Sequence, residues 1–278
     1  MTTPPDEPRG SAPPDDDAEA FARELEALGY IPPDPEEPRP LDLWAQVGDD
    51  LPWGTMLLLL AWGGVYLGLG FTHALEEPEA LYAWGASVTA LPLAPTAWRA
   101  LASTFLHAGA SHLFFNAVTL LVLGPAVERI FARWGFWIVF VLGGAFASFA
   151  SVVARDAFTS GQSSSVGGSG ALFALGGALL VVVWRLRHAL AVARSRALAA
   201  SLLWLIAPGF AAGWTHPGTD NFAHAGGLLA GLLLGALLPT DARLGGRGPD
   251  ARVKAIAALC VLALAGAFVM LVKGALGR

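Results

Sequence analysis

The sequence predicts an all-α polytopic membrane protein: a six-helix transmembrane bundle followed by a seventh, C-terminal transmembrane helix. Of the 278 residues, 55% are hydrophobic and 14% are charged, whereas about 25% are charged in an ordinary soluble domain. The mean hydropathy is +0.56, and the apolar residues gather into long runs. The 17 Lys and Arg residues and the net charge of −5 argue against a nucleic-acid-binding protein. The single cysteine, Cys260, excludes a disulfide framework within the chain.

The sequence contains seven apolar segments, each close in length to the roughly 20 residues that a membrane span needs. The connections between them are short, except for the stretch after the first segment. That long connection contains Trp84, Pro92, Pro95 and Trp98, and its length and aromatic content predict a structured loop at the membrane interface. The predicted spans cover residues 54–74, 112–130, 134–153, 169–186, 197–214, 222–238 and 255–275.

The chain divides into three parts by composition. Residues 1–52 form an acidic, proline-rich tail, in which the first 50 residues hold 14 acidic side chains and three arginines. Such a segment cannot bury enough apolar surface to fold alone, although residues 18–28 have the spacing of a short amphipathic helix. Residues 53–239 form the six-helix core, and residues 240–278 add a basic loop and the seventh helix.

Lysines and arginines predict the orientation in the membrane. With the N-terminus inside, the tail and the loops on that side hold 13 of these residues, and the opposite side holds four. We therefore expect an integral, multi-pass protein of a bacterial inner membrane with a cytoplasmic N-terminus. All even-numbered spans then begin at the outer face.

Four polar residues lie at the starts of these even-numbered spans, where ionisable or polar groups are costly and therefore suggest function. His112 and Asn116 begin the second span, one turn apart on one face. Ser169 begins the fourth span and His224 the sixth. The orientation predicts that all four lie at one depth, about one turn below the outer surface.

These groups have the chemistry of acyl transfer. A serine hydroxyl needs a neighbouring base such as neutral imidazole to become a nucleophile, which His224 can provide for Ser169. His112, the Asn116 amide and the backbone N–H of Ser169 can stabilise an oxyanion. Because no acidic residue within a span is placed to orient His224, the sequence favours a dyad over a triad. The sequence contains neither H-E-x-x-H nor a pair of aspartates in a span, and we expect no metal and no cofactor.

Small residues predict that the fourth and sixth spans pack closely. One ridge carries Gly227, Gly231 and Gly235 on the face of His224, and Gly170, Ala174 and Ala178 form the other. Close backbones would bring Ser169 and His224 within hydrogen-bond reach. Phe173, one turn below Ser169, could stack on the histidine ring.

Five motifs, in this order and spacing, resemble those of the rhomboid intramembrane serine proteases. They are Trp98-Arg99 in the long loop; His107, His112 and Asn116 in HAGASHLFFN; LGPAVER at 123–129; GGSGALFAL at 167–175; and DNFAHAGGLLAGLLLG at 220–235. The resemblance covers roughly residues 84–239. It implies that Ser169 is the nucleophile, that His224 is the general base, and that His112 and Asn116 belong to the oxyanion hole.

The resemblance also implies supporting roles and a substrate class. Trp98 and Arg99 would anchor the first loop in the interface, Glu128 would be a structural polar residue near the inner end of the second span, and His107 would bond within the loop. Gly167, Gly170, Gly227 and Gly231 would shape the site. The family cleaves transmembrane helices of other proteins near their outer ends, in contact with membrane lipid, by opening toward the lipid around the fifth span. Phe173 stands where many relatives carry tyrosine, which keeps the ring but loses a hydroxyl.

The sequence leaves an alternative open. A catalytically silent rhomboid-like protein would bind and escort transmembrane helices. Such relatives typically lose the serine or the histidine, and this chain keeps both Ser169 and His224. A small transporter would show internal repeats, and the sequence shows none.

Overall fold

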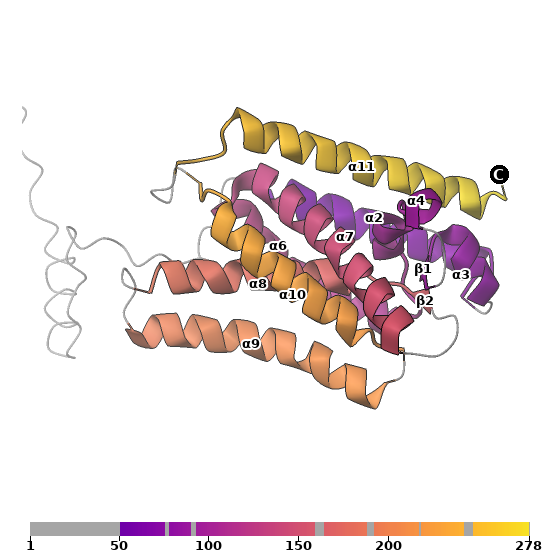
Figure 1. Ribbon diagram of the computed structural model, residues 1–278, viewed down its shortest axis with the longest axis horizontal. Coiled ribbons are helices and arrows are strands. Elements are labelled where there is room, and N and C mark those ends of the chain that lie inside the picture. The colour runs from indigo at the N-terminus through magenta and orange to yellow at the C-terminus, as the bar shows by residue number, and fades with distance from the viewer. Residues whose placement is uncertain are drawn as a thin grey trace, which may run out of the picture. The chain divides into compact units, whose positions relative to one another are not determined.

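The computed structural model describes residues 51–75, 78–89, 93–158, 164–187, 192–216, 218–241 and 247–277. The acidic tail and its predicted helix at 18–28 lie outside these residues. All seven predicted spans are helical, which confirms the all-α fold class (Figure 1). They are α2 (Trp53–Phe71), α6 (Ala110–Ile130), α7 (Ala132–Phe158), α8 (Ser169–Arg185), α9 (Val192–Thr215), α10 (Asn221–Leu237) and α11 (Ala251–Ala275).

Five of these helices, α2, α6, α7, α9 and α11, are long and apolar enough to cross a membrane. The other two, α8 and α10, have 17 residues each. At a rise of 1.5 Å per residue such a helix is about 25 Å long, which is shorter than a hydrocarbon core of about 30 Å. A short helix packed among longer ones can begin below the membrane surface, and these two helices carry Ser169 and His224.

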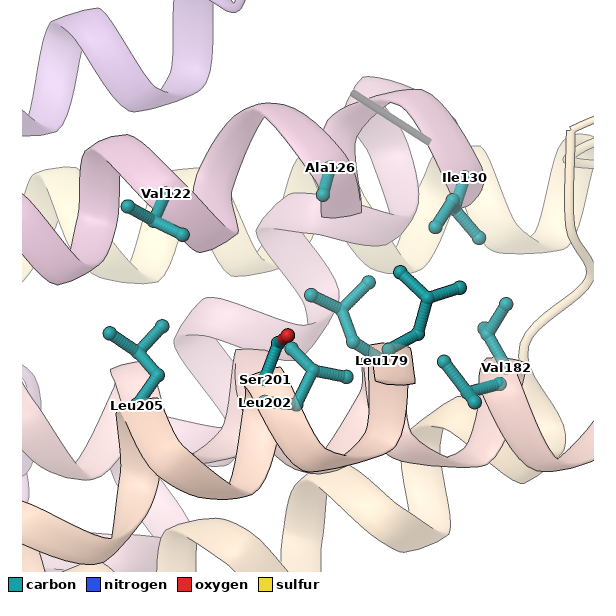
Figure 2. Close-up of a pocket in the computed structure, with 10 residues that line it drawn as sticks. Val122, Ala126, Ile130, Leu179, Val182, Ser201, Leu202 and Leu205 are labelled. Carbon is teal, nitrogen blue, oxygen red and sulfur yellow. The ribbon is translucent and has the colours of Figure 1, made fainter. Parts of the chain in front are cut away.

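Helix α8 lies at the centre of the bundle. It packs against α6, α7, α9 and α10 (Figure 1), and twelve of its 17 residues are buried. A helix that is apolar on every side is stable only in such surroundings. Helix α9, on the outside, is the least buried of the five long spans. An apolar pocket lies between α6, α8 and α9, lined by side chains that include Val122, Leu179 and Leu205 (Figure 2).

Helices α8 and α10 approach backbone to backbone. A Cβ atom added at Gly231 would collide with the carbonyl oxygen of Ala174, and one at Gly227 would collide with the carbonyl oxygen of Gly170. At Gly235 the nearest atom would be Ala178 Cα at 2.7 Å. The three glycines of α10 therefore meet the small residues of α8 in register, and the packing predicted from the two ridges is confirmed.

The long connection after α2 is structured, as predicted. It contains α3 (Pro78–Trp84), β1 (Ser87–Val88), α4 (Leu93–Thr96), α5 (Arg99–Ala102) and the 3₁₀ helix η1 (Ser103–Phe105). Strand β1 pairs antiparallel with β2 (Ser164–Ser165), with Ser87 opposite Ser165. The first loop is thereby tied to the segment that enters α8.

Glu128 joins the end of α6 to the start of α2, which is a structural role. Its carboxylate accepts hydrogen bonds from the backbone N–H groups of Gly54 at 3.0 Å and Thr55 at 2.8 Å, and from the Thr55 hydroxyl at 2.7 Å. These N–H groups open α2 and have no acceptor within their own helix. Pro52, the residue before α2, makes no side-chain hydrogen bond to these groups. Glu128 of α6 therefore acts as their acceptor.

Candidate active site

Two glycines set the position of Ser169 at the start of α8. Gly167 has a φ of +126°, a backbone angle that residues with a side chain rarely adopt. A Cβ atom there would lie 2.7 Å from the His112 ring. A Cβ on Gly168 would collide with Trp62. Only glycine fits at either position, and Ser169 follows as the first residue of the helix.

Ser169 and His224 form a hydrogen-bonded pair between α8 and α10. The Ser169 hydroxyl lies 2.9 Å from His224 Nε2. His224 is 4% exposed, and its Nδ1 atom has no hydrogen-bond partner among the residues that the structure describes. Within that part of the chain, no carboxylate is hydrogen-bonded to the imidazole.

Aromatic rings hold the imidazole in place. The Phe173 ring stacks on that of His224 with centroids 4.2 Å apart and an interplanar angle of 9°, as expected from its position one turn below Ser169. Phe210 of α9 meets both rings edge-on. A Cβ on Gly209 would lie 2.8 Å from Phe173, so α9 closes against this stack.

His112 and Asn116 of α6 lie beside Gly167. A Cβ on Gly167 would lie 2.7 Å from His112 Nε2 and 3.7 Å from Asn116 Nδ2. Asn116 is 6% exposed, and its Nδ2 has no hydrogen-bond partner in the described part of the chain. A buried amide with an unused donor costs free energy, and here that donor lies beside the segment leading to Ser169. The four polar residues singled out in the sequence thus come together around Gly167 to Ser169.

Asp220 is a member of the site that sequence reasoning missed. It is the N-cap of α10, and Oδ1 accepts the N–H of Ala223 at 3.0 Å. Its Oδ2 accepts a hydrogen bond from the Ser151 hydroxyl and pairs with Arg155 at 3.2 Å. Arg155 in turn donates to the Ser164 carbonyl at 3.0 Å. The signal in the sequence is an aspartate four residues before His224, at the start of the span.

The surroundings of Asp220 keep it ionised. Burial alone would raise its pKa, but hydrogen bonds from Ser151, Ala223 and Ser165, together with Arg155, hold the pKa below its ordinary value of 3.8. The carboxylate therefore links α7, the start of α10 and strand β2, which leads into α8. It positions the two helices that carry Ser169 and His224.

Two residues with predicted supporting roles, His107 and Arg99, are buried in the first loop. His107 is fully buried and is held by ring contacts, with centroids 5.0 Å from Trp62 and 5.1 Å from His112. Neither ring nitrogen makes a hydrogen bond of good geometry among the described residues, and the bond within the loop that the resemblance implies takes the form of a weaker polar contact with the Phe105 backbone. A histidine packed between two rings can be fixed by their edges, which spacing alone does not reveal.

Arg99 is buried, and its guanidinium contacts other residues of the first loop. Its Nη1 donates to the carbonyl oxygens of Tyr82 at 2.6 Å and Ala86 at 3.1 Å. The guanidinium lies 3.9 Å from the centre of the Tyr82 ring and 4.7 Å from that of Trp98. Arg99 and Trp98 therefore hold separate parts of the first loop together, because a cation can bind backbone carbonyls and aromatic faces at the same time.

Comparison with known proteins places these residues in a family. A sequence model of the rhomboid domain family matches residues 94–240, which is more than half of the chain. A rhomboid protease, GluP, from Bacillus subtilis is 32% identical over 160 residues, covering 58% of this chain and 30% of that protein. From Arabidopsis thaliana, the mitochondrial rhomboid-like protein 6 is 34% identical over 145 residues, or 51% of this chain and 43% of its own length.

A third relative, rhomboid-like protein 2 from Arabidopsis thaliana, is 35% identical over 141 residues, covering 51% of this chain and 42% of its own length. The chain thus spans less than half the length of each of these three relatives. The matched region begins before Trp98 and ends after α10, so it contains Ser169, His224, His112, Asn116 and Asp220. The chain is an integral, multi-pass membrane protein, and it belongs to the rhomboid family.

Proposed function

We propose that this protein is an intramembrane serine endopeptidase that hydrolyses peptide bonds in or near the transmembrane helices of other membrane proteins. The observation that carries the proposal is the 2.9 Å contact between Ser169 Oγ and His224 Nε2. Near Gly167, the Asn116 amide nitrogen has no hydrogen-bond partner among the described residues. Family membership and the similarity to a protein named a rhomboid protease support the same reading.

In the acylation step, the Ser169 oxygen attacks the carbonyl carbon of the peptide bond while its proton passes to His224 Nε2. Negative charge then develops on the former carbonyl oxygen. The Asn116 amide, the His112 ring and the N–H of Ser169 are the donors available to it. His224 returns the proton to the leaving nitrogen as the C–N bond breaks, which leaves an acyl-serine and a free amine.

Deacylation uses the same groups with water. His224 Nε2 takes a proton from the attacking water, the tetrahedral intermediate forms in the same donor pocket, and the Ser169 oxygen leaves with that proton. The products are a carboxylic acid and a restored dyad. The stack of Phe173 on His224 keeps the ring in one orientation through both steps.

The proposal extends to place and partners. The 13 to 4 distribution of basic residues supports a cytoplasmic N-terminus in a bacterial inner membrane, with the site opening toward the outer side. Substrates would be transmembrane segments that reach the site from the surrounding lipid. Because α8 and α10 are short, they would place Ser169 and His224 below the outer surface of the membrane.

Cleavage of membrane proteins in vesicles tests the proposal. The parent and Ser169→Ala are reconstituted separately with a panel of single-span membrane proteins, and products are identified by mass spectrometry. We expect cleavage near the outer ends of some spans with the parent and none with Ser169→Ala. Panel proteins that are bound by both forms and cleaved by neither would support the silent helix-binding protein instead.

A further inference from the structure

Helix α11 lies outside the region matched by the rhomboid domain, which ends at residue 240. In the structure it packs along α7, α5 and α3 (Figure 1). We propose that α11 is a positioning element, which presses the first loop against the segment leading into Ser169. The predicted effect on catalysis rests on the proposed function. The connection from α11 to Gly167 rests on contacts within the structure.

The buried face of α11 forms one continuous stripe. Small or aliphatic residues recur at intervals of three and four, and the remaining face is largely exposed to the surroundings. Membrane helices associate through close packing of such faces, because lipid removes the usual hydrophobic driving force. The stripe consists of Ala257, Cys260, Leu264, Ala267 and Leu271.

Two contacts connect this helix to the first loop. At the C-terminal end, a Cβ on Gly274 would collide with the carbonyl oxygen of Ala83 in α3, so the two backbones touch. Six residues earlier, the Phe268 ring meets Phe105 of η1 edge-on, with centroids 5.2 Å apart. Phe105 is 3% exposed.

From η1 the contact continues to the candidate active site. The N–H of Gly167 donates to the carbonyl oxygen of Ser103 at 2.9 Å, across the gap between the first loop and the start of α8. Gly167 is the residue that faces His112 and precedes Ser169 by two positions. Helix α7 also holds the loop, because the Ser148 hydroxyl donates to the Ala100 carbonyl at 2.9 Å. The loop is therefore held by both α7 and α11.

A shift of η1 would move the Ser103 carbonyl and, with it, Gly167. Displacements of about 1 Å at a distance from the chemistry can reduce rates by about a hundredfold. The site is sensitive in this way because Gly167 sits against both His112 and, through its neighbour, Trp62. The seventh helix thus extends the positioning of the site beyond the family's own domain.

The test uses the full chain in detergent, with glycine variants of one helix. Gly274→Leu inserts a side chain between α11 and α3, and Gly274→Ala inserts only a methyl group. Gly266→Leu is the matched control, because nothing lies within 4 Å of a Cβ at that glycine. All three changes favour the helix itself, since glycine is a poor helix former.

Two readings are taken from each variant. The first is hydrogen exchange in the segment 164–169, which reports the Gly167 to Ser103 hydrogen bond whether or not the protein is active. The second is the labelling of Ser169 by a fluorophosphonate, separated into a binding constant and a maximal rate. We expect faster exchange and a maximal rate lowered about ten- to a hundredfold in Gly274→Leu, a smaller effect in Gly274→Ala, and parental values in Gly266→Leu.

Phe268 gives an independent check. Phe268→Ala removes the ring against Phe105 and should raise the same exchange, and Phe268→Leu should restore most of the protection. Met270→Ala, on the exposed face, should behave as the parent. A folded Gly274→Leu and a folded Phe268→Ala with parental exchange would overturn the proposal. If the parent itself is not labelled, the proposed function fails, and the exchange data alone decide the role of α11.

Discussion

Gly231 of α10 rests directly on the backbone carbonyl of Ala174 in α8. This contact sets the distance between the two helices that carry His224 and Ser169. A hydrogen bond of 2.9 Å between their short side chains requires the backbones to be this close. The glycines of α10 therefore belong to the site as much as the polar side chains do.

Gly231→Leu tests this relationship. The added side chain has no space beside Ala174, and we expect the free energy of unfolding to fall by about 3 kcal/mol and fluorophosphonate labelling to be lost. Thermal unfolding in detergent and labelling measure the two effects. Gly64→Leu is the control, because a Cβ at Gly64 meets nothing within 4 Å. Full labelling of Gly231→Leu would show that the close approach is not needed.

Asn116→Ala should lower the catalytic rate while leaving the fold intact. The amide nitrogen of Asn116 has no partner in the described part of the chain, so its removal breaks no observed hydrogen bond of that atom. Loss of one oxyanion donor costs about 10²–10³-fold in kcat. Single-turnover cleavage and the melting temperature separate the two effects. An unchanged rate would remove Asn116 from the oxyanion hole.

Asp220→Asn should reveal a pH-dependent part of the stability. Asparagine keeps the helix cap but loses the charge that pairs with Arg155, and we expect a loss of about 2 kcal/mol at neutral pH. Because the pKa of Asp220 is lowered in the folded protein, its carboxylate contributes stability above the ordinary value. That contribution disappears as pH falls through the lowered pKa.

The measurement for Asp220 is the difference in melting temperature between parent and variant across pH. The difference should be constant above about pH 5 and shrink below about pH 4. Asp250→Asn is the control, because Asp250 caps α11 at an exposed position, accepting the N–H of Val253 at 2.9 Å. A difference for Asp220→Asn that does not change with pH would contradict the ionised pair.

Phe173→Leu should slow labelling of Ser169 by loss of the stacked ring. An aromatic pair contributes about 0.5–1.5 kcal/mol, which corresponds to roughly two- to tenfold in rate. Phe173→Tyr keeps the ring and should label at nearly the parental rate, because the stacking geometry with His224 is retained. Equal labelling of all three forms would show that the ring does not hold the imidazole in a productive orientation.

The fold was predictable because membrane spans follow from composition. Seven apolar runs gave seven helices, and the small residues of α8 and α10 predicted their contact. The helix ends were less predictable: α7 runs to Phe158, beyond the apolar run that ends at residue 153. The extra turn carries Arg155, which pairs with Asp220. Hydropathy cannot predict a polar helical turn that is stabilised by a tertiary contact.

The meeting of Ser169, His224, His112 and Asn116 was predictable from the orientation of the spans. The supporting contacts were not. They depend on which loops fold over the bundle: examples are the contacts of Asp220, of Arg99 with the Tyr82 carbonyl, and of the His107 ring. Those contacts join residues far apart in the sequence, and spacing along a single helix carries no information about them.

Labelling with a fluorophosphonate tests the central claim most directly, because it needs no knowledge of the substrate. The parent, Ser169→Ala and His224→Ala are compared in detergent at equal folded concentration, and the modified residue is mapped by mass spectrometry. The account predicts a single adduct on Ser169 in the parent and none in either variant. A folded parent that stays unlabelled, or a His224→Ala variant labelled as fast as the parent, would contradict it.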